Sequence, residues 1–183
     1  MKSNRTLILN ALLIVIFYSC TPENPTPNPT PTTLSIGQSY QGGIIAYIDA
    51  SGLHGLIAAP SDQGQAPWGC MGTAIAGADG TAIGTGSQNT IDIMNGCSEL
   101  NKAASLCKNL DLNGYGDWYL PSLDELNQLY INRVAIGGFD GLYYWSSTES
   151  SSTLAWRIYS ADGIQFVLSK YVNDCSVRAV RSF

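Results

Sequence analysis

The sequence predicts an α+β domain in which short central helices are framed by antiparallel β-strands at both ends. The segments near residues 43–59 and 142–183 are rich in β-branched and aromatic side chains and are interrupted by turn-forming residues. The region between them carries apolar residues at helical spacing instead. The 183 residues, 45% of them hydrophobic, suffice for one domain with a real core.

A β-hairpin is expected near the start of this domain. Residues 44–48 form an apolar, β-branched run, residues 49–52 have turn chemistry, and residues 55–59 form a second apolar run. His54, the only histidine, lies in or beside this turn. A single histidine without neighbouring ligands is a turn residue rather than a metal ligand or a catalytic base.

The Gly-rich stretch 62–90 is expected to be a long ordered loop held by Trp68. It lacks the Lys-Ser/Thr ending of a phosphate-binding loop, so nucleotide binding is not predicted. Ser87 or Asn89 is available to cap a helix after this loop. Apolar residues then recur at helical spacing over 91–107, which predicts two short helices or one helix interrupted near Asn95 and Gly96.

The stretch GYGDWYLPSLDELNQLY, residues 114–130, predicts a helix that begins with a capping box. The Ser122 hydroxyl can accept from the amide of Glu125, and the Glu125 carboxylate can accept from the amide of Ser122. Asp124 adds negative charge in the first turn, where the helix dipole favours it. Leucines 123, 126 and 129 form one apolar face.

Asp117 is the acidic residue of this stretch that the capping box leaves unexplained. It could bond local backbone as a turn residue, or it could join Asp111 and Asn113 in a calcium site. The spacing of an EF-hand is absent, because Gly114 is misplaced and no Glu follows at the required distance. No cofactor is predicted, and calcium stays a minor alternative.

The C-terminal third predicts an antiparallel meander. Strand-like runs occupy residues 142–148, 155–160, 164–171 and 176–183, and Ala-Asp-Gly at 161–163 is a hairpin signal. The strands at the two ends of the domain are expected to pair.

The N-terminus predicts export and membrane anchoring. A short basic start and an apolar run, residues 1–19, are typical of a signal peptide, and Cys20 directly follows as a lipidation site. An ordinary signal peptide and an uncleaved anchor are the alternatives. Residues 20–35 are a Pro/Thr-rich linker, a semi-rigid spacer below the folded domain at 36–183. We expect a bacterial outer-membrane lipoprotein, periplasmic or surface-exposed.

Charge excludes one class of partner. Lys2 and Arg5 leave with the signal, so 7 of the 9 basic residues remain against 14 acidic ones, a formal net charge of −7. There is no basic run, so nucleic acid is not an expected partner.

Four cysteines remain after Cys20 in a compartment that permits disulfides. They are Cys70, Cys97, Cys107 and Cys175, which allow three pairings. Cys97 with Cys107 is preferred, because these two are nearest in the chain.

Several motifs together resemble the Lcl C-terminal domain family, named for a bacterial collagen-like adhesin. They are GGIIAYIDASGLHGLIAAPSDQ, WGC, GTG-x-x-NT, GYGDWYLPSLDELNQLY, YWSSTE, AWRIYSADG and VRAVRSF, and they span about residue 36 to 183. More distantly, the chain is similar to formylglycine-generating and C-type-lectin-like folds. The resemblance implies a C-type-lectin-like domain with a role in attachment and glycan binding. The acidic charge and the lack of collagen-like repeats argue against binding sulfated polysaccharides as a trimer.

The resulting hypothesis is a non-enzymatic envelope lipoprotein that presents a binding domain for a glycan or another surface ligand. Aromatic faces with hydroxyl and amide partners suit neutral sugars. The candidate ligand-binding residues are Tyr144, Trp145, Ser147, Glu149, Trp156 and Arg157, with burial of the tryptophans in the core as the alternative. A structural protein that docks on a protein partner is a second hypothesis. An enzyme related to the sulfatase-modifying fold is a third, and it would need a reactive cysteine.

Overall fold

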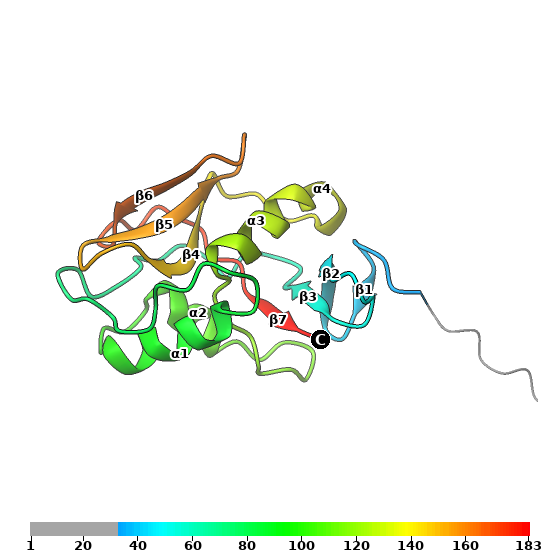
Figure 1. Ribbon diagram of the computed structural model, residues 1–183, viewed down its shortest axis with the longest axis horizontal. Helices are drawn as coiled ribbons and strands as arrows, with labels where there is room; N and C mark the ends of the chain where they lie inside the picture. The colour runs from blue at the N-terminus through cyan, green and yellow to red at the C-terminus, as the bar shows by residue number, and fades with distance from the viewer. Residues whose placement is uncertain (1–32) are drawn as a thin grey trace, which may run out of the picture. The chain divides into compact units, whose positions relative to one another are not determined.

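The first sheet joins the two ends of the domain. The computed structural model describes residues 33–183, and its first sheet has the order β1-β2-β3-β7 (Figure 1). Its strands, all antiparallel to their neighbours, are β1 (Ser39–Tyr40), β2 (Gly43–Ile48), β3 (Gly55–Ala58) and β7 (Val180–Ser182). Because β3 pairs with β7, the predicted pairing of terminal strands is confirmed, as is the β2–β3 hairpin.

The second sheet is the predicted meander. It consists of β4 (Tyr143–Glu149), β5 (Leu154–Tyr159) and β6 (Gln165–Ser169), in that order. The final strand β7 leaves this meander and completes the first sheet. The two sheets and the helices confirm the α+β class.

The helices lie between these strands in the sequence. They are α1 (Gly86–Gly96), α2 (Ala103–Lys108), α3 (Leu123–Ile131) and the short α4 (Arg133–Ile136). The interruption expected near residue 96 therefore separates α1 from α2. The expected capping of α1 by Ser87 or Asn89 is wrong, since the helix begins at Gly86 after Thr85. The Asn89 side chain instead donates to the Gly80 carbonyl, which ties the helix to the Gly-rich loop.

Two groups of buried residues hold the elements together. One contains Trp68, Trp118 and Trp145 and packs α1 and α2 against the second sheet. The other packs Leu126 and Leu129 of α3 between the two sheets. Each fully buried large apolar side chain contributes about 1.5–3 kcal/mol, so this face of α3 is a main source of its stability.

The expected signal peptide, the Cys20 lipidation site and most of the linker lie outside the described residues. Thr33–Phe183 forms one compact unit. Within that unit no helix is long and apolar enough to cross a membrane.

Candidate functional site

The six residues predicted to bind a ligand do not share an exposed surface. The side chains of Tyr144, Trp145 and Ser147 are fully buried, and Arg157 is 7% exposed. Glu149 and Trp156 are partly exposed. The prediction that these side chains form an exposed face is therefore wrong for the four buried residues. The central residues of β4 are buried, and Arg157 lies beside them in β5.

The buried members of this set have partners inside the protein. The Tyr144 hydroxyl donates to Asp62 at 2.7 Å, and the Trp145 indole donates to the Ala66 carbonyl at 3.0 Å. The Ser147 hydroxyl accepts from the amide of the Asn89 side chain at 3.2 Å. These contacts connect β4 to the loops around it and give the YWSST motif a structural role.

Glu149 and Arg157 also have partners within the domain. Glu149 forms an ion pair with the buried Lys170 and accepts from the amide of Ile75 at 3.0 Å. The Arg157 guanidinium lies over the rings of Tyr143 and Phe166, 3.9 and 4.4 Å from their centroids. It also donates to the thiol sulfur of Cys175 at 3.3 Å.

The capping box is confirmed, and its glutamate does more than start a helix. Glu125 is fully buried, and one carboxylate oxygen accepts from the amide of Ser122 while the other accepts from the amide of Gly84, both at 2.8 Å. The Tyr119 hydroxyl donates to the second oxygen at 3.3 Å. Burial raises the pKa of this carboxyl group. The Gly-rich motif and the LPSLDEL motif therefore meet at one buried carboxylate.

Asp117 is explained by an ion pair. Its two oxygens accept from Nε and Nη2 of Arg181 at 2.6 and 2.8 Å, a bidentate geometry. This hydrogen bonding lowers the pKa of Asp117. Among the described residues, the one group of three metal-ligating side chains is Cys70, Cys97 and Glu99, and both cysteines are in a disulfide. Asp111 and Asp117 are thus not part of such a group.

The disulfide joins Cys70 to Cys97, so the preferred pairing of Cys97 with Cys107 is wrong. The Cα atoms of the bonded cysteines are 5.6 Å apart although 27 residues separate them in the chain. Cys97 follows the last residue of α1, whereas Cys107 lies within α2 and is buried in the core as a free thiol. Closeness in the sequence did not decide the pairing, because the long loop that contains Cys70 lies against the end of α1, where Cys97 is.

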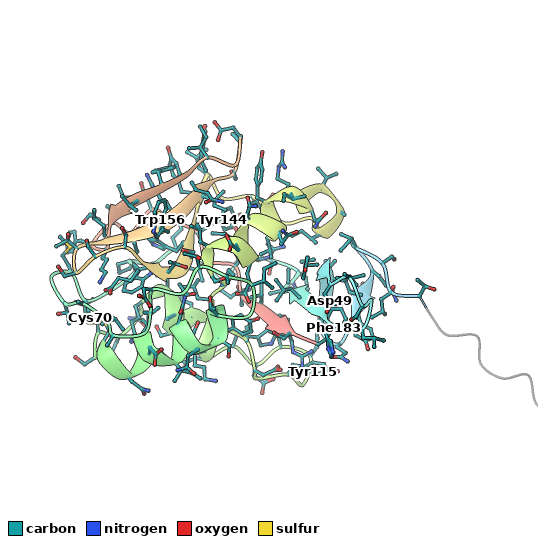
Figure 2. All side chains as sticks on the ribbon, viewed as in Figure 1. Asp49, Cys70, Tyr115, Tyr144, Trp156 and Phe183 are labelled. Carbon is teal, nitrogen blue, oxygen red and sulfur yellow. A yellow bond between two sulfur atoms is a disulfide. The ribbon has the colours of Figure 1, made fainter. Side chains whose placement is uncertain are left out.

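This disulfide anchors the best candidate for a binding surface, which we call the Glu99 surface. It is formed by two hollows that both have Glu99 in their lining. The first, of 670 Å³, is lined by residues from the α1–α2 connection, α2 and the loop after β3, among them Asp62, Leu100, Asn101, Lys102 and Asn109. The second, of 600 Å³, is lined by Pro67, Met71, Glu99, Lys170, Tyr171, Val172 and Asn173. Cys70 marks this region in Figure 2.

The backbone under the Glu99 surface is fixed by several contacts. The Cys70 amide donates to Oε2 of Glu99 at 2.9 Å, and the Lys102 ammonium donates to the Glu99 carbonyl at 2.8 Å. Cys70 and Asn101 have positive φ angles of 49° and 57°. Residues other than glycine rarely adopt this conformation, and it persists where surrounding structure imposes it. Oε1 of Glu99 has no hydrogen-bond partner among residues 33–183.

The side chains on the Glu99 surface combine apolar and polar groups. Leu100 is 85% exposed, Tyr171 80% and Met71 47%, and they come from three separate loops. Asn101 and Asn173 add amides, and Glu99 adds a carboxylate. An exposed ring with amide and carboxylate neighbours can stack on the apolar face of a sugar and bond its hydroxyls.

Sequence reasoning missed this surface because its exposed apolar side chains, Met71, Leu100 and Tyr171, lie outside the motifs that resemble the family. Exposed Tyr171 stands at the end of a strand-like run, and SELN at 98–101 looks like ordinary loop. The sequence feature that could have pointed to this surface is Cys97, which directly precedes that loop, since a disulfide at Cys97 fixes the loop beside it.

The fold places the protein in the class of α+β domains with two antiparallel sheets. Its motif residues are buried, and loops form its ligand-sized hollows. The family model of the Lcl C-terminal domain matches residues 73–181, more than half of the chain, and the chain belongs to this family. The predicted family is thereby confirmed. The match begins after Cys70, so strands β1 to β3 precede it. No curated protein matched the chain.

Proposed function

We propose that this protein is a non-enzymatic lipoprotein of the bacterial envelope whose Lcl C-terminal domain binds a neutral glycan at the Glu99 surface. The observation that carries the proposal is the meeting of two hollows at Glu99, on backbone fixed by the Cys70–Cys97 disulfide. A site fixed before binding loses less conformational entropy when the ligand binds. A binding site formed by loops is also what the C-type-lectin-like fold expected from the sequence would imply.

A neutral ligand fits the charge of the Glu99 surface better than an anionic one. Its two hollows contain the carboxylates of Asp62 and Glu99 and the ammonium groups of Lys102 and Lys170. Both lysines are buried and already bonded, Lys102 to a carbonyl and Lys170 to Glu149. Asp62 is likewise paired, with Arg178. The unpaired exposed charge is therefore the carboxylate of Glu99, and a sulfated chain would be repelled.

Docking on a protein partner is the second candidate function. It is favoured by the exposure of Leu100, Met71 and Tyr171, because aromatic residues and methionine are enriched in the centres of protein interfaces. Competition by free sugar separates the two functions, since a glycan ligand is displaced by its own oligosaccharide and a protein partner is not.

The proposal that the protein is not an enzyme rests on its thiols. Burial raises the pKa of both free cysteines within residues 33–183, that of Cys175 to about 11. A thiol in that state is a poor nucleophile. Cys107 and Cys175 therefore lack the reactivity that an enzyme of the sulfatase-modifying type requires.

A glycan-array screen followed by calorimetry tests the proposal. The purified protein should bind a neutral oligosaccharide, and Tyr171→Ala and Glu99→Gln should each weaken binding at least about tenfold, or 1.4 kcal/mol. Asp79→Asn, which removes an exposed carboxylate that lines neither hollow, is the matched control and should bind normally. Absence of any sugar binding, with or without calcium, would reject glycan recognition.

Anchoring needs its own experiment. Metabolic labelling with palmitate should label the wild-type protein and leave Cys20→Ala unlabelled. A labelled Cys20→Ala protein would reject Cys20 as the lipidation site.

A further inference from the structure

Strand β6 is an edge strand of the second sheet. It pairs with β5 on one side, and Figure 1 shows it at the margin of the domain. Just before β6, the amide of Tyr159 donates to the carbonyl of Ile164 at 2.9 Å. Just after β6, the amide of Lys170 donates to the carbonyl of Thr153 at 3.0 Å. These two hydrogen bonds determine which residues of β6 point towards β5.

The backbone groups of Gln165, Val167 and Ser169 point away from β5. Hydrogen bonds alternate along an antiparallel pair, so Phe166 and Leu168 bond β5 and the residues beside them do not. No other segment that the structure describes bonds the amides or carbonyls of Gln165 and Val167. The outer edge of β6 therefore offers unpaired donors and acceptors to a further strand.

This edge lacks the features with which proteins prevent edge strands from pairing. Such features are charged side chains, proline, bulges, very short strands and covering segments. The five residues of β6, QFVLS, include no charge and no proline, and their register with β5 is regular. The edge strand β1 of the first sheet, in contrast, has only two residues. An unprotected edge of this kind indicates pairing with another strand.

We propose that β6 pairs antiparallel with β6 of a second copy of this chain, so that two chains share one continuous sheet. In this dimer Val167 faces Val167 of the second copy, and Gln165 faces its Ser169. Phe166 likewise faces Leu168 of the second copy. The outward backbone groups of the two strands then lie opposite one another, and facing aromatic and branched side chains stabilise strand pairs.

Charge favours a second copy as the occupant of this edge. The chain is acidic, with a formal net charge of −5 at pH 7, so two copies repel one another unless their facing surfaces carry no charge. Strand β6 provides such a surface. Of the acids nearest to it in the sequence, Asp174 is paired with Arg157 at 3.8 Å. Asp162 precedes β6, so the antiparallel arrangement places the two Asp162 side chains at opposite ends of the paired strands.

The oligomeric state of the full-length protein in a non-ionic detergent tests the proposal, measured by sedimentation velocity over a range of concentrations. Wild type should be dimeric. Val167→Lys places like charges opposite one another and should weaken dimerisation at least about tenfold. The fold should tolerate this change, because Val167 is partly exposed and its backbone does not bond β5. Val134→Lys, the same change at a 90% exposed residue of α4, is the matched control and should stay dimeric.

An exchange of charge tests the register of the two strands. Val167→Asp alone should also weaken dimerisation, because the two new charges are again alike. A mixture of Val167→Lys and Val167→Asp should form dimers, because opposite charges then face one another at the centre of the pair. A folding defect cannot produce this recovery.

A wild-type protein that is monomeric at every concentration, or that forms trimers, would overturn the proposal. A monomer would leave the β6 edge to a strand of a different protein. A dimer that Val167→Lys leaves intact, or a mixture of the two charged variants that stays monomeric, would overturn it as well. None of these results bears on glycan binding, because the lining of neither hollow of the Glu99 surface includes a residue of β6.

Discussion

The amide of Gly84 donates a 2.8 Å hydrogen bond to the buried carboxylate of Glu125, which connects the Gly-rich loop to the start of α3. Gly86 lies against the same carboxylate with no side chain of its own. The acidic and glycine-rich motifs of this family thus form one structural junction. The proposed ligand site lies in other loops, at the Glu99 surface.

Gly86→Ala should destabilise the protein. The new Cβ would lie 2.6 Å from the amide nitrogen of Ser122 and would also contact the Glu125 carboxylate. We expect a loss of about 1–3 kcal/mol in the free energy of unfolding, measured by urea denaturation. Gly116→Ala is the control, because nothing lies within 4 Å of its Cβ. Equal stability of the two variants would contradict the claim that the close contact of Gly86 with Ser122 and Glu125 stabilises the fold.

Asp117→Asn should remove a pH-dependent contribution to stability. Because the folded pKa lies below the ordinary value of 3.8, the Arg181 pair stabilises the fold above that pH and is lost as pH falls through the folded pKa. Wild type should exceed Asp117→Asn in stability by at most about 1 kcal/mol at pH 7, since the Asp117 side chain is exposed. The difference should shrink at pH 3. A stability difference that is the same at both pH values would show that the ion pair does not couple the ionisation of Asp117 to folding.

Glu149→Gln should be among the most destabilising single changes. It leaves the buried Lys170 ammonium without its anion, which costs about 3–5 kcal/mol. The double variant with Glu149→Leu and Lys170→Met should recover much of this loss, since it removes both charges. Asp79→Asn, an exposed change, is the control. A double variant no more stable than Glu149→Gln would contradict this explanation.

Thiol labelling checks the cysteines. Under native conditions Cys107 and Cys175 should resist an alkylating reagent, because both are buried. In denaturant without reductant these two should react, and peptide mass spectrometry should find Cys70 joined to Cys97. Rapid native labelling of Cys175 would revive the enzyme hypothesis.

The sequence predicted those parts of the fold that depend on local pattern. The capping box of Ser122 and Glu125 has a spacing that only a helix start satisfies. The β2–β3 hairpin likewise follows from turn residues between two apolar runs.

Burial and long-range pairing were not available from local pattern. Tyr144 and Trp145 look like a sugar-binding surface in sequence, yet their polar atoms bond Asp62 and Ala66 inside the fold. Amphipathic aromatic residues serve equally in cores and in sites. The disulfide partner of Cys97 depended on where a loop returns, which no local pattern encodes.

The proposed function places the ligand at the Glu99 surface rather than on strands β4 and β5. Amide chemical-shift mapping with the best oligosaccharide from the array distinguishes these two locations directly. We predict the largest shifts at residues 98–102 and 170–173. Shifts centred on residues 143–149 and 154–159, with residues 98–102 and 170–173 unchanged, would contradict this location.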